Sequence, residues 1–244
     1  MIRVRLAPGA DLAGFRKAVR ALAAAGAPAE VAFETGEDLF GAEPPAEAPP
    51  VALPRPVAEL IETVVCHRDP ERYALLYDLV QRVLTGERHV LELAHDPLVR
   101  RLEDMARTVR REIHKMHAFL RFRLVAGAEP ERYAAWFEPE HFVLEAVAPF
   151  FVDRFRTFRW SIFTPLGSLH WDRRALTFGP PESRAAAPAN DAFEEGWRGY
   201  YESTFNPARV NPEAMRAQMP QRYWRNMPEA AAIPELVRSA ASRV

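Results

Sequence analysis

Cysteine is nearly missing from this 244-residue chain, and other common motifs are missing with it. Cys66 is the single cysteine, so no disulfide can form within the chain and no CxxC pair exists to hold zinc or an iron–sulfur cluster. The sequence also has no GxSxG, Walker-type or GxGxxG motif, which excludes the ordinary hydrolase, NTPase and dinucleotide-binding classes. We therefore predict neither a metal site nor a cofactor.

Long apolar runs are absent as well. No run approaches the roughly 20 residues that a membrane-spanning helix needs. The first residues, MIRVRLAPGADLAGF, contain no apolar stretch of signal-peptide length. With 48% hydrophobic and 27% charged residues, the composition is that of an ordinary globular protein, and we expect it to be cytoplasmic.

Lysine is scarce, because only Lys17 and Lys115 are lysines among the 32 basic residues. A general bias of the sequence toward arginine and alanine explains why arginine replaces lysine. The abundance of arginine has a physical consequence, because guanidinium groups bind phosphates and base edges bidentately. Residues 1–66 carry six basic and nine acidic side chains, whereas the remainder carries 26 and 24. Overall charge therefore does not require a nucleic-acid partner, and only a local cluster would argue for one.

The hydrophobic pattern predicts an α+β protein. Residues 1–40 have the pattern of a small strand–helix–strand lobe, with Asp11 capping the helix. Residues 41–56 contain six prolines and are expected to form a linker. Residues 57–244 are expected to form the main domain.

That main domain is predicted to begin with three helices, of which the second and third start at Asp69–Pro70 and Asp96–Pro97. A hairpin over 118–138, a helix over 140–155 and a three-strand meander over 158–180 should follow, and the hairpin and the meander together should form an antiparallel sheet. A helical C-terminal arm is expected over residues 191–244.

One helix face carries the first candidate site. Arg110, His114 and His117 are spaced i, i+4 and i+7 and lie within about 60 degrees of one another on a helix. Eight basic and three acidic residues occur between 100 and 123, which suits a phosphate-binding face that includes Lys115, Arg121 and Arg123. A solvated helix face without a ligand is the structural alternative. If the site is catalytic, His114 and His117 are the expected acid–base groups.

Ser168, His170 and Asp172 alternate along one predicted strand. They should share one face of the sheet, which suggests a catalytic triad. Side chains two residues apart on a strand are about 6.5 to 7 Å apart, however, so we expect them to be too distant for a direct relay.

The last candidate is the segment from Trp197 to Trp224, in which six aromatic residues mix with polar groups at irregular intervals. Such segments occur where turns hold rings and amide or guanidinium groups around a ligand, often a nucleotide. Packing of the rings into the core is the structural alternative. The residues predicted to bind nucleic acid here are Tyr201, Asn206, Arg209, Asn211, Tyr223 and Trp224.

Several phrases together resemble a known bacterial family: REIHKMHAFLRFRLV, RWSIFTP, SLHWD and YYESTFNPARVNPEAMRAQMPQRYW. The family is a domain of unknown function assigned to DNA metabolism. It occurs beside a radical SAM enzyme proposed to modify or repair DNA, and fused ahead of uracil-DNA-glycosylase-type domains. The resemblance extends over about residues 1–240 and implies a setting in DNA repair, but no catalytic residue set.

Three functions remain open. The first is a DNA-binding accessory that acts with the radical SAM enzyme. The second is an enzyme that acts on a nucleobase or nucleotide, with His114 or His117 as acid–base group. The third is a structural partner of the radical SAM protein without DNA contact. DNA binding with a strong salt dependence, turnover of a lesion, or neither would distinguish them.

Overall fold

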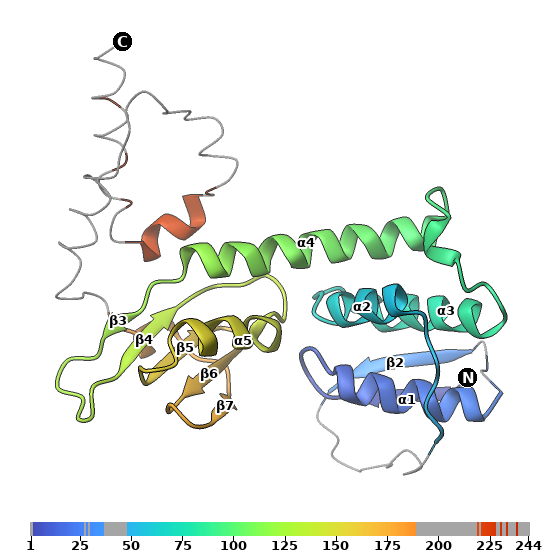
Figure 1. Cartoon of the computed structure of the whole chain (residues 1–244), viewed down its shortest axis with the longest axis horizontal. Coiled ribbons are helices and arrows are strands. Elements are labelled where there is room, and N and C mark those ends of the chain that lie inside the picture. Colours follow the sequence, from blue (N-terminus) through green and yellow to red (C-terminus); the bar gives the residue numbers. More distant parts are fainter. Residues whose placement is uncertain are drawn as a thin grey trace. The chain divides into compact units, whose positions relative to one another are not determined.

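The computed structural model describes residues 2–26, 28, 30–36, 48–188, 219, 221–227, 230, 233 and 238. The chain divides into two compact units (Figure 1). Unit 1 comprises Met1–Ile113 and Glu140–Ala146, and unit 2 comprises His114–Pro139 and Val147–Val244. The predicted α+β class is confirmed, since helices accompany a five-stranded sheet and a separate two-stranded one.

Unit 1 begins with the predicted strand–helix–strand lobe. Strand β1 (Ile2–Leu6) pairs in parallel with β2 (Val31–Thr35), and helix α1 (Leu12–Ala24) connects them. Asp11 caps α1 as predicted, because its Oδ1 accepts a hydrogen bond of 2.7 Å from the Gly14 N–H. The buried residues of α1 recur at helical spacing: Phe15, Ala18, Val19 and Leu22.

Helices complete unit 1. Helix α2 covers Arg55–Val64, α3 covers Arg72–Leu84, and a 3₁₀ turn, η1 (Val90–Glu92), precedes α4 (Pro97–Phe119). The lobe and these helices share one hydrophobic core, in which Tyr73 and Leu76 of α3 are fully buried beside Phe15. Residues 41–47 of the predicted linker lie outside the described residues. The last two residues of the predicted linker, 55–56, already belong to α2.

Asp96 fixes the start of α4, as the sequence predicts. Its Oδ1 accepts hydrogen bonds from the backbone N–H groups of Leu98 and Val99 at 2.9 and 3.1 Å. Its other oxygen accepts from Arg82 at 2.7 Å, and this contact, with those backbone groups, lowers the pKa of the carboxyl. The longest helix of the described chain therefore begins at a fixed residue.

Unit 2 contains the five-stranded sheet, ordered β3-β4-β5-β6-β7. The strands are β3 (Arg123–Leu124), β4 (Tyr133–Trp136), β5 (Trp160–Thr164), β6 (Gly167–Trp171) and β7 (Leu176–Gly179). The hairpin and the meander are antiparallel as predicted, but β4 and β5 pair in parallel. A crossover through α5 (Leu144–Arg154) makes this parallel pair possible.

Aromatic side chains fill one face of the sheet in unit 2. Trp160 is 1% exposed, and its ring centroid lies 5.6 Å from Phe122 and 6.3 Å from Phe151 of α5. The opposite face carries the polar residues Ser161, Ser168 and His170. Ser161 of β5 pairs with His170 of β6, and Ser168 lies two residues before His170 on the same strand. The first predicted strand is shorter than expected, because α4 continues to Phe119.

Candidate nucleic-acid interface

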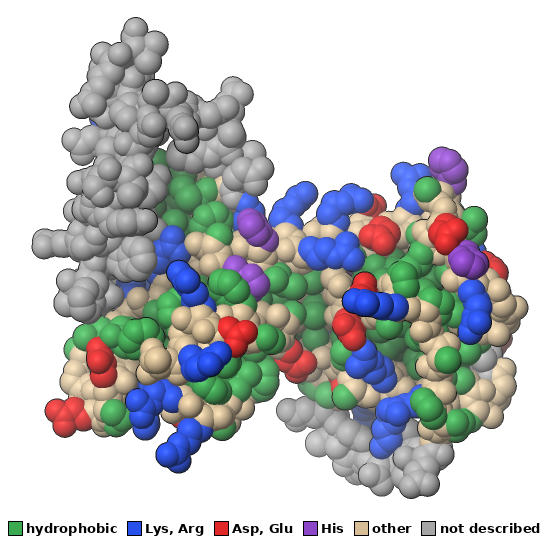
Figure 2. Space-filling view, in the orientation of Figure 1, with side chains coloured by type: hydrophobic (Ala, Val, Ile, Leu, Met, Phe, Trp, Pro, Cys, Tyr) green, Lys and Arg blue, Asp and Glu red, His purple; other side chains and the backbone are tan. Residues whose placement is uncertain are grey.

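The solvent side of α4 carries a basic surface. Val99, Leu102 and Val109 face the core and are at most 3% exposed. The rest of the helix surface presents exposed arginines: Arg100, Arg101, Arg107, Arg110 and Arg111. Arg100, Arg107 and Arg111 fall within about 40 degrees of one another and extend over about 16 Å of the helix axis. Figure 2 shows basic side chains along α4.

Acidic neighbours neutralise this surface only in part. Arg101 contacts Asp69 at 2.7 Å, Arg107 contacts Asp104 at 2.8 Å, and Arg110 lies 3.7 Å from Glu103. Within the described part of the chain, Arg100 and Arg111 have no acidic partner. Exposed pairs of this kind contribute little stability, so the guanidinium groups can exchange a carboxylate for a phosphate at small cost.

The two candidate histidines have different environments in unit 2. His114 is exposed. The His117 ring stacks on Phe150, with centroids 3.9 Å apart and planes inclined by 21°. Burial, and secondly the nearby His114, lowers the pKa of His117. Its Nε2 is buried and has no hydrogen-bond partner among the described residues, so this nitrogen is left unsatisfied in that part of the chain.

Three of the predicted DNA-binding cations are engaged within unit 2. Lys115 is 6% exposed, with its Nζ 5.5 Å from the centre of the Phe119 ring. Arg121 donates hydrogen bonds to the carbonyls of Ala118 and Leu120 at 2.8 and 3.1 Å, which satisfies the end of α4. Arg123 is 7% exposed and donates to the Pro188 carbonyl at 3.1 Å. Their binding role stays a prediction, and the exposed arginines of α4 are the more accessible group.

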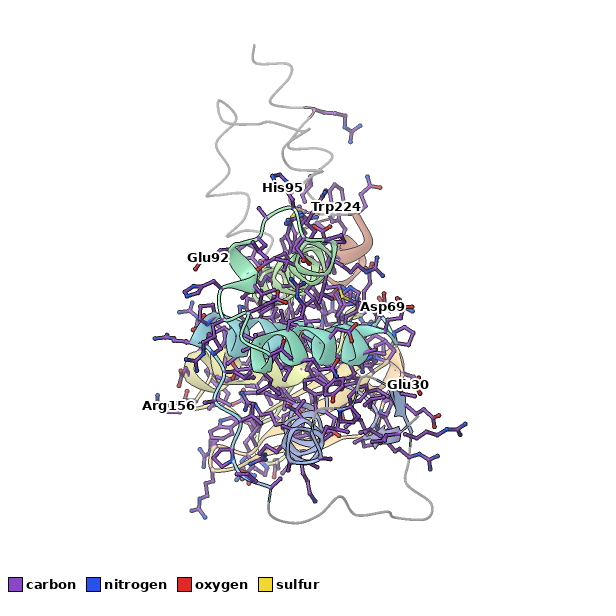
Figure 3. All side chains as sticks on the ribbon, turned by 90° about the vertical axis from the view of Figure 1, so that its right-hand side faces the viewer. Glu30, Asp69, Glu92, His95, Arg156 and Trp224 are labelled. Atoms are coloured by element: carbon purple, nitrogen blue, oxygen red, sulfur yellow. The ribbon has the colours of Figure 1, made fainter. Side chains whose placement is uncertain are left out.

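The aromatic residues of the C-terminal motif are described only in part. Tyr223, in the 3₁₀ helix η4 (Gln221–Asn226), is 3% exposed and stacks between Phe119 and Phe137, at centroid distances of 5.6 and 5.1 Å. Trp224, labelled in Figure 3, is half-buried and donates from Nε1 to the Met219 carbonyl at 3.0 Å. The other predicted residues of this motif lie outside the described residues: Tyr201, Asn206, Arg209 and Asn211.

A histidine between two serines corrects one expectation. His170 Nε2 lies 3.1 Å from Ser168 Oγ, so the expected separation is wrong for this pair of side chains. Its Nδ1 lies 2.8 Å from Ser161 Oγ on the neighbouring strand. Burial, and then Arg132, lowers the pKa of His170.

No Ser–His–Asp triad forms around this histidine, because Asp172 is exposed and accepts instead from the backbone N–H groups of Arg174 and Ala175. Ser168 itself is 1% exposed. Ser168 and His170 therefore share one face of the sheet, as the alternation predicts. The imidazole ring is long enough to reach both serine hydroxyls, although the spacing of residues along a strand is larger than a hydrogen bond.

A second histidine pair, in unit 1, was not predicted. The rings of His67 and His141 lie 4.4 Å apart, and His141 is 6% exposed. Each Nδ1 accepts a backbone N–H: His67 from Asp69 at 3.1 Å, and His141 from Arg68 at 3.3 Å. These residues are 74 positions apart and carry no common spacing signal, so only the fold reveals the pair.

This pair is poorly suited to a metal ion. A metal bound through Nε2 would require Nδ1 to carry the proton, whereas both Nδ1 atoms already face backbone donors. Among the described residues, no group of three or more His, Cys, Asp or Glu side chains is arranged to hold a metal. In the same part of the chain, no helix has the length and apolar character to cross a membrane.

Comparisons with known proteins identify one family. No curated protein and no solved structure matches the chain. A family model, DUF4130, described as a domain of unknown function, matches residues 70–229. The match covers about two thirds of the chain and includes α3, α4, the five-stranded sheet and η4. The chain therefore belongs to the DUF4130 family of domains of unknown function.

Proposed function

We propose that the protein is a DNA-binding accessory that positions DNA for a radical SAM enzyme of DNA modification or repair. The exposed arginine face of α4 is the observation that supports DNA binding. The resemblance to the DNA-metabolism family supports the choice of partner. The protein's contribution in this proposal is to hold the DNA backbone, while its partner performs the chemistry.

The chemistry of the α4 face favours a phosphate backbone over an acidic protein. Planar guanidinium groups match phosphate oxygens bidentately. Arg100 and Arg111 are free of carboxylates in the described part of the chain, and three further arginines are held only by exposed pairs. A row of about 16 Å meets several consecutive phosphates of one DNA strand. Binding through such contacts does not depend on sequence.

Fluorescence anisotropy with a 20-base-pair duplex and the matching single strand tests this proposal, with the full chain over a range of salt concentrations. The triple variant Arg100→Gln, Arg107→Gln, Arg111→Gln is expected to bind both DNAs more weakly. If all three arginines contact phosphates, the slope of log K against log salt for the duplex becomes shallower by about 2.7. A matched control replaces three exposed arginines elsewhere with Gln: Arg55, Arg88 and Arg156.

Equal weakening in the control would reduce the effect to net charge and reject α4 as the interface. Absence of DNA binding by the unaltered protein at low salt would support the third function, a structural partner without DNA contact. Co-purification with the radical SAM protein tests the proposed partner separately, since it does not require DNA.

The environment of His117 favours an enzyme as the second candidate function. A neutral imidazole whose Nε2 has no hydrogen-bond partner in the described chain can accept a proton, provided that a base or a sugar displaces the groups that bury this nitrogen. Incubation of the protein alone with lesion-bearing DNA tests this candidate. Product that disappears in His117→Gln, while DNA binding persists, would establish it. If the protein alone forms no product from any lesion tested, the result argues against an enzyme and favours the DNA-binding accessory.

A further inference from the structure

A cavity of about 480 Å³ lies in unit 1, between α1, α2 and residues 50–53. Its floor is apolar: Phe15, Val19, Ile61 and Val80 line it, and each is at most 5% exposed. This volume falls within the range of about 300 to 1,000 Å³ that small-molecule sites occupy. The arginine face of α4 does not line this cavity, so a ligand here would not need the surface proposed to bind DNA.

The walls and rim of the cavity differ in chemistry. Val51, Leu53 and Ala58 are half-buried and form apolar walls. Arg16 and Arg20, one turn apart on α1, also line the cavity. The site therefore combines an apolar interior with cations that α1 supplies.

The charges on α1 are mostly uncompensated. Arg16 contacts Glu62 at 2.5 Å. The only hydrogen bond of the Arg20 side chain in the described chain joins its Nε to the Arg16 carbonyl at 3.2 Å, so its two terminal nitrogens have no acidic partner there. Helix α1 carries three cations, Arg16, Lys17 and Arg20, and no acidic residue.

We propose that this cavity binds a small amphiphilic anion: an apolar ring or chain that carries one carboxylate, phosphate or sulfonate group. The apolar part would replace water against Phe15, Val19 and Ile61, which is favourable in proportion to the area covered. The anionic group would lie at Arg20, where a charge-assisted hydrogen bond is available. A cationic ligand is disfavoured by the two guanidinium groups, and a neutral one leaves the terminal nitrogens of Arg20 without an acidic partner in the described chain.

Two sources supply this chemistry, and they differ in the apolar part. An acyl carboxylate presents a flexible chain, whereas a nucleoside monophosphate presents a planar base. Both would place the anion at Arg20, so competition between them identifies the class that fits the floor.

Fluorescence titration with 8-anilinonaphthalene-1-sulfonate, an apolar ring system with one sulfonate, tests the cavity in the full-length protein. We expect saturable binding with a blue-shifted emission, displaced by decanoate or by adenosine monophosphate. Arg20→Gln should weaken binding about fivefold to tenfold, as expected from the loss of one charge-assisted contact. Lys17→Gln, on the same helix and with the same change of charge, does not line the cavity and should leave binding unchanged.

Filling the cavity gives the decisive result. Ala58→Phe and Val51→Trp each place a large ring in the cavity and should abolish saturable binding while the melting temperature stays near that of the unaltered protein. If Ala58→Phe does not fold, Val51→Trp, at a half-buried position outside the helices, decides. No saturable binding by the unaltered protein, or equal binding by the filled variants, would overturn the proposal.

Discussion

The paired imidazoles of His67 and His141 make the stability of unit 1 sensitive to acid. Burial, then the neighbouring His67, and then Arg68 lower the pKa of His141 from its ordinary 6.5 to about 4. Geometry acts in the same direction, because protonation would place an N–H of His141 against the Arg68 N–H that it now accepts. The pKa of His67 is also lowered, mainly by burial.

The direction in which stability changes with pH depends on whether the folded or the unfolded chain binds the proton at the higher pH. The unfolded chain takes up a proton on His141 near pH 6.5, whereas the folded chain remains neutral to about pH 4. Stability is therefore fully present above about pH 6.5 and is lost as the pH falls toward 4. The difference of about 2.5 between the two pKa values corresponds to about 3 kcal/mol of stability, most of which is lost by pH 5.

Urea unfolding at pH 7, 6 and 5 measures this loss as a change in the free energy of unfolding. His141→Asn removes the titrating ring but retains an oxygen that can accept the Arg68 N–H. This variant should be less stable at pH 7 and lose about 2 kcal/mol less than the unaltered protein between pH 7 and 5. His89→Gln, at an exposed histidine, should follow the unaltered protein. Identical pH profiles for His141→Asn and the unaltered protein would refute the reasoning.

Three further predictions concern single side chains. Tyr223→Ala should lower the free energy of unfolding by about 3 to 5 kcal/mol, because it removes a buried aromatic ring from between Phe119 and Phe137. A change of less than about 1 kcal/mol in urea unfolding would contradict this packing. Gly179→Ala would place a Cβ 2.5 Å from Ser168 Oγ, so we expect a loss of about 1 to 3 kcal/mol and displaced His170 ring signals in NMR spectra. Burial, and then Glu145, raises the pKa of the Cys66 thiol to about 11. A disulfide reagent at pH 8 should therefore react with the folded protein much more slowly than with the urea-unfolded chain. Equal reaction rates would contradict the burial of this thiol.

Local signals in the sequence predicted the elements of the fold but not all of their pairings. Asp11 and Asp96 cap helices where the sequence placed caps, since capping depends on residues within one turn. The parallel pairing of β4 with β5 was missed, because the alternation in each strand shows which residues share a face but not which strand lies alongside.

The candidate sites show the same limit. The exposed face of α4 follows from helical period alone, so Arg110 and His114 are on the surface as their spacing indicates. Lys115 and Arg123 also read as surface cations, yet both are buried, and Arg123 contacts a carbonyl 65 residues away in the sequence. The His67–His141 contact joins a loop before α3 to one before α5, and no periodicity encodes it.

Glu112 has a consequence for how the chain can be divided. Its Oε2 accepts the backbone N–H groups of Glu140 and His141, both at 2.8 Å, so a short later segment belongs to unit 1. The polypeptide consequently passes between the units three times, after residues 113, 139 and 146. A fragment ending at residue 113 would retain the Glu112 carboxylate but lose both donors, so the units are interleaved in sequence and no single cut separates them.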